Sequence, residues 1–126
     1  MRQIKLILAA LIGAALCLLA TPFTACADWA DMGEYRLTAY CNCRKCCGRW
    51  AGGPTASGTT PEAGRTIAVD KRVIPLGTRV MIDGHEYVAE DTGSGIYGSR
   101  IDIFFDDHGD ARDFGVQYAD VKIWED

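Results

Sequence analysis

Three aspartates in the second half of the 126-residue chain occupy positions where strand-forming sequence makes a carboxylate unusual. Asp70 ends a short apolar run, Asp91 ends a second strand-like segment, and Asp102 interrupts the apolar run 101–105. Burying a carboxylate among apolar side chains is unfavourable unless it is hydrogen-bonded or takes part in chemistry. When carboxylates share a site, the pKa of one of them rises, so a proton donor is available near neutral pH. We therefore expect the three acids to meet in one site that performs general acid chemistry.

Asp102 is the strongest candidate for the proton donor, because its apolar neighbours in the run 101–105 should raise its pKa. A position facing solvent or a salt bridge with Arg100 is the structural alternative. Asp91 would place negative charge beside Asp102, although an Asx-type turn explains the same residue. Asp70 either orients the site or caps the turn that follows it.

Short strand-like segments must position these acids. Alternating or apolar runs predict strands at 35–40, 66–69, 77–83, 85–90, 100–105 and 120–124. The Asp83-Gly84 pair predicts a tight hairpin, and residues 107–114 before Gly115 predict the one helix. Runs 67–69 and 101–105 are apolar at nearly every residue, as in strands covered on both faces. The fold expected is mainly β, a small closed six-stranded barrel with one short helix, with a β-sandwich as the alternative.

The first 27 residues have the pattern of a cleaved export signal. Arg2 and Lys5 precede an apolar stretch, and Ala25-Cys26-Ala27 offers small residues for cleavage. A lipoprotein signal, which would leave Cys26 acylated and the protein lipid-anchored, is the alternative. We expect a secreted protein without a membrane span, with a lead-in at 28–36 and a single domain at 37–126.

Size and charge narrow the partners of the exported protein. Loss of the leader leaves 99 residues, enough for one small core, and changes the net charge from −4 to −6 because Arg2 and Lys5 leave with it. An acidic chain is a poor ligand for nucleic acid or an anionic surface. A neutral polymer such as a glycan meets no such repulsion. We expect a monomer that does not bind nucleic acid.

Four cysteines form a tight cluster; they are Cys41, Cys43, Cys46 and Cys47. In an exported protein, an even number of clustered cysteines favours disulfides, whose pairing the sequence leaves open. A zinc site of four thiolates is an alternative, although adjacent Cys46 and Cys47 fit tetrahedral coordination poorly. A redox motif is a second alternative, although a thioredoxin-like frame is absent. His85 and His108 are interpreted as structural, so no metal and no cofactor is expected.

Six blocks of sequence carry a resemblance to a known family. They are Thr38-Ala39-Tyr40, Thr55-Ala56-Ser57-Gly58-Thr59, Ile67-Ala68-Val69-Asp70, Val73-Ile74-Pro75-Leu76-Gly77-Thr78, Ala89-Glu90-Asp91-Thr92-Gly93 and Arg100-Ile101-Asp102-Ile103-Phe104-Phe105. In these blocks and their order the chain resembles the 3D domain, a family named for three aspartates in a double-psi β-barrel. The family's barrel is similar to that of MltA-type lytic transglycosylases and of secreted stationary-phase muralytic proteins. One loop departs from the pattern, because Tyr97 stands where the family usually has lysine.

The resemblance implies an enzyme that acts on peptidoglycan glycan strands, secreted or associated with the cell wall. It implies cleavage of the β-1,4 bond after N-acetylmuramic acid by the sugar's own C6 hydroxyl, which leaves an anhydro-muramyl end. The family aspartates map onto Asp70, Asp91 and Asp102, with Asp102 as the catalytic acid. Candidate substrate-binding residues are Tyr40, Thr55, Ser57, Thr92, Gly93, Gly95, Tyr97 and Arg100, and Trp50 is a further aromatic candidate for stacking on a sugar.

Two other functions remain open at this point. A non-catalytic glycan-binding or wall-remodelling module could use the same barrel. A metal- or thiol-dependent protein could be built around the cysteine cluster.

Overall fold

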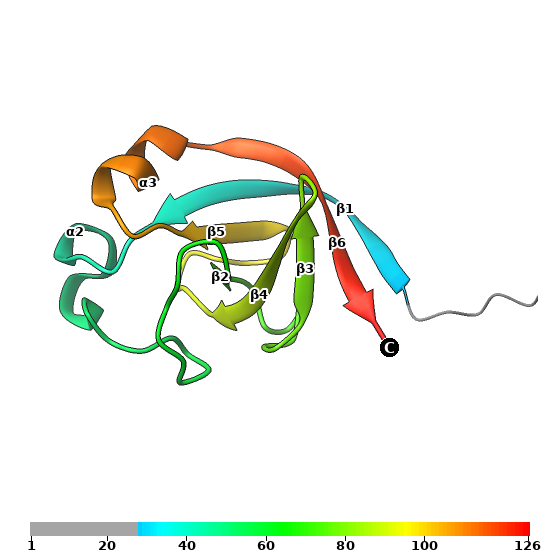
Figure 1. The fold of residues 1–126 in the computed structure, drawn as a ribbon, viewed down its shortest axis with the longest axis horizontal. Helices are drawn as coiled ribbons and strands as arrows, with labels where there is room; N and C mark the ends of the chain where they lie inside the picture. The colour runs from blue at the N-terminus through cyan, green and yellow to red at the C-terminus, as the bar shows by residue number, and fades with distance from the viewer. Residues whose placement is uncertain (1–27) are drawn as a thin grey trace, which may run out of the picture.

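The computed structural model describes residues 28–126 of the chain. The expected leader at 1–27 and the alternative lipid attachment at Cys26 lie outside these residues. The described residues form six strands closed into a barrel, with short helices gathered toward one end (Figure 1). This arrangement confirms the predicted mainly β, closed six-stranded barrel and excludes the β-sandwich.

The described residues contain six strands. They are β1 (Asp28–Tyr40), β2 (Thr66–Ala68), β3 (Arg79–Ile82), β4 (His85–Asp91), β5 (Arg100–Phe104) and β6 (Gln117–Glu125), and the long connection from β1 to β2 carries two short helical segments. Around the barrel the strand order is β1-β5-β2-β4-β3-β6, and β6 pairs with β1 to close it. Strand β1 is parallel to β5 and β2 is parallel to β4, whereas the other neighbours are antiparallel.

Strand β1 is longer than the sequence pattern indicated. Its first part pairs with β6 from Asp28 onward, and its last part pairs with β5. A bulge between Asp31 and Gly33 interrupts the pairing, and Gly33 has φ 81, a value that favours glycine. The residues 28–36, expected as a lead-in, are therefore part of the barrel wall. The bulge breaks the alternation of side chains that a sequence pattern relies on.

Mainly aliphatic side chains from the six strands and from the segment after β2 fill the barrel interior. The buried core consists of Tyr35, Leu37, Ile67, Val69, Ile74, Val80, Ile82, Ala89, Ile101, Ile103, Val121 and Ile123. Every residue of β2 is buried, as expected for a strand covered on both faces. Burial of this apolar surface is the main favourable contribution to folding, and it gives the site a rigid frame.

The predicted hairpin is confirmed. Strands β3 and β4 pair from Arg79↔Val88 to Ile82↔His85 around the two-residue turn. Asp83 and Gly84 have φ 49 and 75, the positive values that a tight hairpin turn of this type requires.

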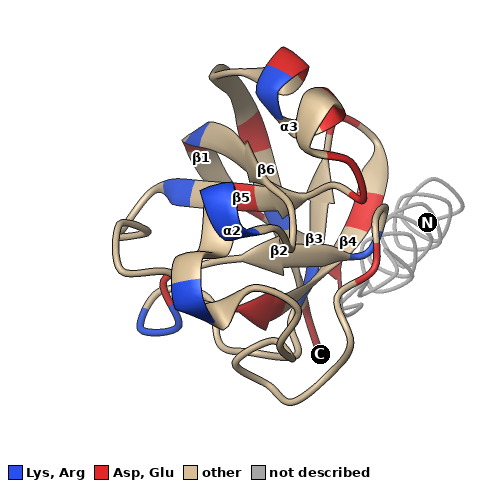
Figure 2. Cartoon of the chain, turned by 90° about the vertical axis from the view of Figure 1, so that its left-hand side faces the viewer, with Lys and Arg blue, Asp and Glu red and all other residues tan. Residues whose placement is uncertain are grey.

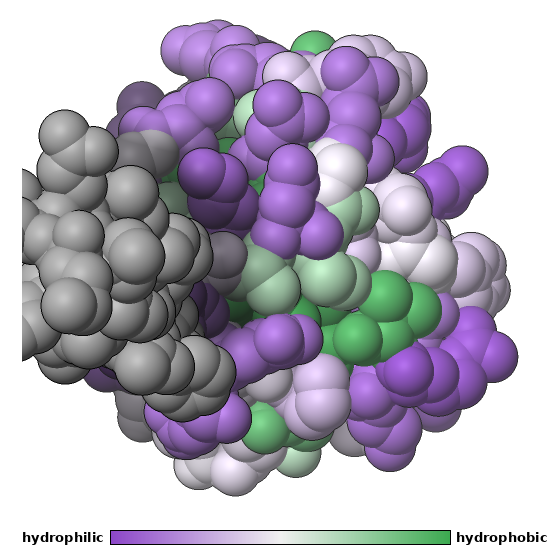
Figure 3. Space-filling view, turned by 90° about the vertical axis from the view of Figure 1, so that its right-hand side faces the viewer, coloured by the Kyte–Doolittle hydropathy of each residue, from purple (hydrophilic) through white to green (hydrophobic). Residues whose placement is uncertain are grey.

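The short helices lie in the connections between strands: α2 (Arg44–Cys47) and the 3-10 turn η1 (Gly48–Trp50) between β1 and β2, and α3 (His108–Phe114) between β5 and β6. The predicted helix is α3; the Asp107 side chain accepts a hydrogen bond from the Asp110 N–H at 3.1 Å and caps it. Two segments were not predicted, α2 and η1, and neither contains a buried residue. No helix in residues 28–126 is long and apolar enough to cross a membrane. The barrel end opposite these helices presents a largely hydrophilic surface with a small apolar area (Figure 3).

Candidate active site

Asp91 and Asp102 lie in one row of paired residues that crosses four neighbouring strands of the barrel. Thr38 of β1 pairs with Asp102 of β5, Asp102 pairs with Ala68 of β2, and Ala68 pairs with Asp91 of β4. Neighbouring strands lie about 4.8 Å apart, so the backbones of Asp91 and Asp102 are separated by roughly 10 Å across Ala68. The methyl side chain of Ala68 leaves the space between the two acids open.

A bulge in β4 brings Asp91 into this row. Ile67 pairs with Ala89, but Ala68 pairs with Asp91, so the register skips Glu90. Bulges of this kind redirect side chains next to functional sites. Glu90 is buried instead and accepts hydrogen bonds from Arg65 Nε at 2.8 Å and from the Thr66 hydroxyl at 2.9 Å.

A cleft of about 710 Å³ opens above the row of paired residues. Its walls come from the end of β1, the cysteine loop, the segment 53–61 and the loop after Asp91. The lining residues are Tyr40, Asn42, Cys46, Cys47, Trp50, Gly53, Pro54, Thr55, Ala56, Pro61, Ala68, Asp91, Thr92, Gly93, Ser94 and Asp102. This volume is typical of sites that bind small organic molecules or part of a polymer.

Asp102 has the properties of a proton donor. Burial, and to a smaller extent the charge of Asp91, raises its pKa to about 6, although the hydrogen bond from Thr38 acts in the opposite direction. The Thr38 hydroxyl donates to Oδ1 at 3.0 Å. Within residues 28–126, the Oδ2 atom of Asp102 has no hydrogen-bond partner. Every fully buried side-chain nitrogen or oxygen atom in these residues does have a partner, so Oδ2 is accessible to solvent. Oδ2 is therefore open to the cleft and free to exchange a proton with a ligand.

Three donors hold the Asp91 side chain in place. Its Oδ1 accepts from the N–H groups of Ala56 at 3.0 Å and Thr92 at 2.9 Å, and its Oδ2 accepts from the Tyr40 hydroxyl at 2.8 Å. Burial and the adjacent charge of Asp91 raise the pKa of Tyr40, so its hydroxyl stays protonated as a donor. The Asp91 side chain is thus fixed in position, and its oxygens are largely occupied by these donors.

Asp70 does not share the cleft, which corrects the expectation that all three acids meet. Its Oδ1 accepts from Arg72 Nε and from the Arg72 N–H, both at 3.0 Å. Its Oδ2 accepts from Arg72 Nη2 and from the Gly98 N–H, both at 2.9 Å. These bonds, the Arg72 side chain first, hold the pKa of Asp70 well below its usual range. The physical reason is the neighbouring Arg72, whose charge and donors favour the ionised form.

The other predicted binding residues divide into two groups. Tyr40, Thr55, Thr92 and Gly93 line the cleft, as does Trp50, whose side chain is 71% exposed. Ser57, Gly95, Tyr97 and Arg100 do not line it. Ser57 lies within 3.0 Å of the Thr55 hydroxyl, and Arg100 donates to the Gly95 carbonyl at 3.3 Å. The structure thus places these four residues outside the cleft lining.

The structure adds lining residues that the sequence did not single out. Asn42 lies in the middle of the cysteine cluster; its amide donates to the Gly53 carbonyl at 3.2 Å and accepts from the Gly52 N–H at 2.8 Å. This asparagine ties the loop after η1 to the end of β1. Ser94, on the loop after Asp91, adds a hydroxyl to the lining. In the sequence, the one signal for Asn42 and Ser94 is that each lies next to or between blocks of the family pattern.

The cysteine cluster does not form the expected disulfides. Cys41, Cys43, Cys46 and Cys47 are all free thiols in the structure. Three of them group with His108, which had been interpreted as a structural residue. Among the described residues, this is the one group of His, Cys, Asp and Glu side chains close enough to hold a metal ion.

Residues 65–125 match the family model described as the 3D domain. This part of the chain is a 3D domain, as the sequence blocks had indicated. The match begins at the start of β2, so β1 and the cysteine loop precede it.

Two proteins of Bacillus subtilis (strain 168) are relatives in sequence. YabE, named for cell wall shaping, is 42% identical over 88 residues, which cover 68% of this chain and 21% of YabE. YocH, named a cell wall-binding protein, is 43% identical over 76 residues, which cover 56% of this chain and 26% of YocH. The chain thus spans about a fifth to a quarter of the length of these relatives.

Two solved structures share the barrel. The lytic transglycosylase LtgG of Burkholderia pseudomallei aligns with a TM-score of 0.50 and 31% identity, covering 58% of this chain and 26% of LtgG. MltA of E. coli with bound chitohexaose aligns with a TM-score of 0.52 and 21% identity, covering 60% of this chain and 29% of MltA. The likeness to MltA is one of fold.

Proposed function

We propose that the protein is a lytic transglycosylase that cleaves the β-1,4 bond between N-acetylmuramic acid and N-acetylglucosamine in peptidoglycan. The observation that carries this proposal is Asp102: a carboxyl group with a pKa of about 6, open to the cleft and beside a fixed carboxylate. The 3D domain, its relatives with names that refer to the cell wall and the barrel shared with LtgG support the substrate class. The site of action is then the cell wall, outside the cell.

In the first step, protonated Asp102 donates its proton to the glycosidic oxygen. The bond between this oxygen and C1 of the muramic acid breaks, and positive charge develops on the ring as in an oxocarbenium ion. A general acid needs a pKa near the working pH to hold the proton and release it. The fixed carboxylate of Asp91 stabilises the positive charge as it forms.

In the second step, the C6 hydroxyl of the same muramic acid attacks C1. Asp102 is now ionised and takes the proton of this hydroxyl as the new C6–O–C1 bond forms. The product is a 1,6-anhydro-muramyl end, and the catalytic proton is back on Asp102. No water is consumed, and one carboxyl group serves both steps.

The environment of Asp91 favours this route over hydrolysis. Glycoside hydrolases use a second carboxylate as nucleophile or as the base that activates water. The Asp91 oxygens accept bonds from Ala56, Thr92 and Tyr40, which leaves little capacity for either task. We therefore assign Asp91 an electrostatic role.

The remaining lining residues would bind the glycan strand. Trp50 offers an exposed aromatic face on which a sugar ring can stack. Thr55 and Thr92 supply hydroxyl groups, and the backbone at Gly93 allows close approach of a sugar. Asp70 acts outside the cleft, where its bond to the Gly98 N–H braces the loop that carries Thr92 and Gly93.

Digestion of purified sacculi tests the proposal directly. The full chain is incubated with sacculi across pH 4 to 8, and released muropeptides are analysed by mass spectrometry. We expect products with anhydro-muramyl ends from the wild type and none from Asp102→Asn. Asp120→Asn, which alters an exposed acid on β6, is the matched control and should retain full activity.

Two results would contradict the proposal. Products with ordinary reducing ends would identify a hydrolase. Retained binding to sacculi without any cleavage would identify a glycan-binding module, the function that the name of YocH favours.

A further inference from the structure

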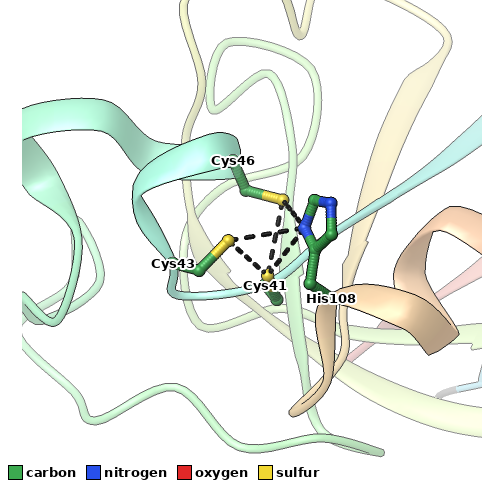
Figure 4. A group of neighbouring side chains, drawn as sticks. All are labelled: Cys41, Cys43, Cys46 and His108. Atoms are coloured by element: carbon green, nitrogen blue, oxygen red, sulfur yellow. Dashed lines mark hydrogen bonds between the residues drawn. The ribbon is translucent and has the colours of Figure 1, made fainter.

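Four side chains converge on one point between the cysteine loop and the start of α3 (Figure 4). The Cys41 sulfur lies 3.0 Å from that of Cys43 and 3.4 Å from that of Cys46. Nδ1 of His108 lies 3.5 Å from the Cys41 sulfur and 3.4 Å from each of the other two. All four atoms lie within 4.8 Å of one another.

These distances fit a tetrahedral metal centre better than disulfides. Bond lengths of about 2.3 Å for Zn–S and about 2.05 Å for Zn–N place the ligands of a zinc tetrahedron roughly 3.8 Å (S to S) and 3.5 Å (S to N) apart. The three sulfur-to-nitrogen distances match, and the two sulfur-to-sulfur distances of 3.0 and 3.4 Å are shorter than the tetrahedral value by about 0.8 and 0.4 Å. A disulfide requires about 2.05 Å between sulfurs, well below either observed distance.

We propose that Cys41, Cys43, Cys46 and His108 bind one Zn²⁺ ion. The donor set of three thiolates and one imidazole is typical of structural zinc sites, and the separation of Cys43 and Cys46 is a usual ligand spacing. Four protein ligands leave no open position, so the ion is structural. Its binding displaces protons from the three thiols and needs no oxidant or reductant.

Cys47 lies outside this ligand set. Its thiol donates to the Cys41 carbonyl at 3.2 Å and its side chain lines the cleft. The site therefore avoids the crowding that adjacent Cys46 and Cys47 would cause in a centre of four thiolates. His108, which is distant from the cysteines in the sequence, supplies the fourth ligand.

The surroundings suit a thiolate-rich centre. Three thiolates, a neutral imidazole and Zn²⁺ carry one net negative charge. Arg44 and Lys45 lie on α2 within the ligand segment, and Figure 2 shows the basic colour of α2 at the end of the barrel that carries the helices. The Cys41 ligand is buried, with 2% exposure, and excludes water from one side.

The ion would hold one wall of the cleft in place. Helix α2 and turn η1 contribute no buried residue to the core, so packing does little to fix them. Cys46 and Trp50 from this segment nevertheless line the cleft. Coordination by His108 ties the segment to α3, which packs against β1.

Metal content tests the site independently of glycan cleavage. The full chain is purified under reducing conditions without chelator, and zinc is measured by elemental analysis. We expect about one zinc ion per chain in the wild type. His108→Ala should bind zinc at least about a hundredfold more weakly, because even loss of a supporting hydrogen bond typically weakens binding 10- to 100-fold. His85→Ala and Cys47→Ser, each matched in residue type, should keep the metal.

Cobalt replaces the variants if they do not fold. The wild type loaded with Co²⁺ should show thiolate-to-cobalt charge transfer and the strong visible bands of tetrahedral Co²⁺. A weak octahedral spectrum would overturn the proposal. So would disulfides in the native protein with no zinc bound after reduction, or a zinc affinity of His108→Ala equal to that of the wild type in competition with a chelator.

Limited proteolysis tests whether the ion holds the loop. Trypsin can cut after Arg44, Lys45 and Arg49, all in the loop. Chelator treatment of the reduced protein should speed these cuts about tenfold or more, and zinc should reverse the effect, because cleavage follows local opening. Equal rates with and without metal would contradict a structural role.

Discussion

Asp102 and Asp70 are the same residue type at the same kind of position, next to apolar strand residues, yet the barrel gives them opposite electrostatic states. Burial and the charge of Asp91 raise the pKa of Asp102 to about 6. Arg72 and the Gly98 N–H lower the pKa of Asp70 below its usual range. The carboxyl group of Asp102 can therefore donate a proton near neutral pH, whereas that of Asp70 cannot.

The comparison shows that neighbours decide what a carboxyl group can do. Among residues 28–126, Asp102 accepts from one donor, the Thr38 hydroxyl, whereas four N–H donors surround the two oxygens of Asp70. The first arrangement leaves an oxygen for a ligand, and the second fixes a turn and a loop. We therefore assign proton transfer to the cleft and support of the loop to the Asp70 region.

The largest effect is expected from Asp102→Asn. The amide is similar in shape and can still accept from Thr38, but it cannot donate the catalytic proton. Cleavage of sacculi should fall by about 10³-fold or more, within the range typical of general acid–base groups.

The same substitution should lower activity but leave the thermal stability of the protein unchanged or higher. Ionisation of a group whose pKa is raised on folding lowers stability as pH rises from the ordinary aspartate range through about 6. Asp102→Asn removes this effect, so its melting temperature should equal or exceed that of the wild type above pH 6. A clear loss of stability there would mean that the carboxylate is structural.

Asp91→Asn should have the next largest effect. Removal of the charge should lower activity by roughly 10- to 100-fold, because a fixed electrostatic contribution to the transition state is lost. The pKa of Asp102 should fall, so the alkaline limb of the pH–activity profile should move to lower pH. An unchanged limb would contradict the coupling of the two acids.

Asp70→Asn should change stability more than chemistry. The bonds from Arg72 and Gly98 weaken, and the melting temperature at neutral pH should drop by about 5 °C or more. Because the pKa of Asp70 is lowered on folding, this difference should shrink as pH falls below the ordinary aspartate range. Activity at low temperature should fall less than about tenfold. If Asp70→Asn lost as much activity as Asp102→Asn while its stability stayed unchanged, Asp70 would have to take part in catalysis.

Thr38→Val should give the smallest change and sharpen the comparison. The hydrogen bond from Thr38 lowers the pKa of Asp102, so its removal should raise that pKa. The alkaline limb should move to higher pH, opposite to Asp91→Asn, with activity changed by only about a few fold. A shift in the same direction for both variants would mean that Thr38 acts on the site in another way.

Most of the barrel could be predicted from local sequence. Alternating and apolar runs located all six strands, and Asp83-Gly84 identified the hairpin turn, because these features are short-range. The start of β1 was placed too late, since the bulge at Gly33 breaks its alternation. The segments α2 and η1 were not predicted, since they contain no apolar periodicity.

The site was harder to predict because it depends on contacts between distant residues. The register skip at Glu90 that brings Asp91 to the cleft is a property of the β2–β4 pairing, which the sequence of β4 alone does not reveal. The capture of Asp70 by Arg72, two residues away, could have been anticipated from charge alone. The approach of His108 to cysteines more than 60 residues earlier could not.

The most direct test of the central claim is the titration of the aspartate side chains by NMR, with the carboxyl carbons of the wild type assigned through Asp102→Asn and Asp70→Asn. We predict that Asp102 titrates with a pKa of about 6 and that Asp70 remains ionised well below the ordinary aspartate range. If Asp102 instead titrates with the exposed aspartates, it does not hold a proton near neutral pH, and its assignment as the catalytic acid is wrong.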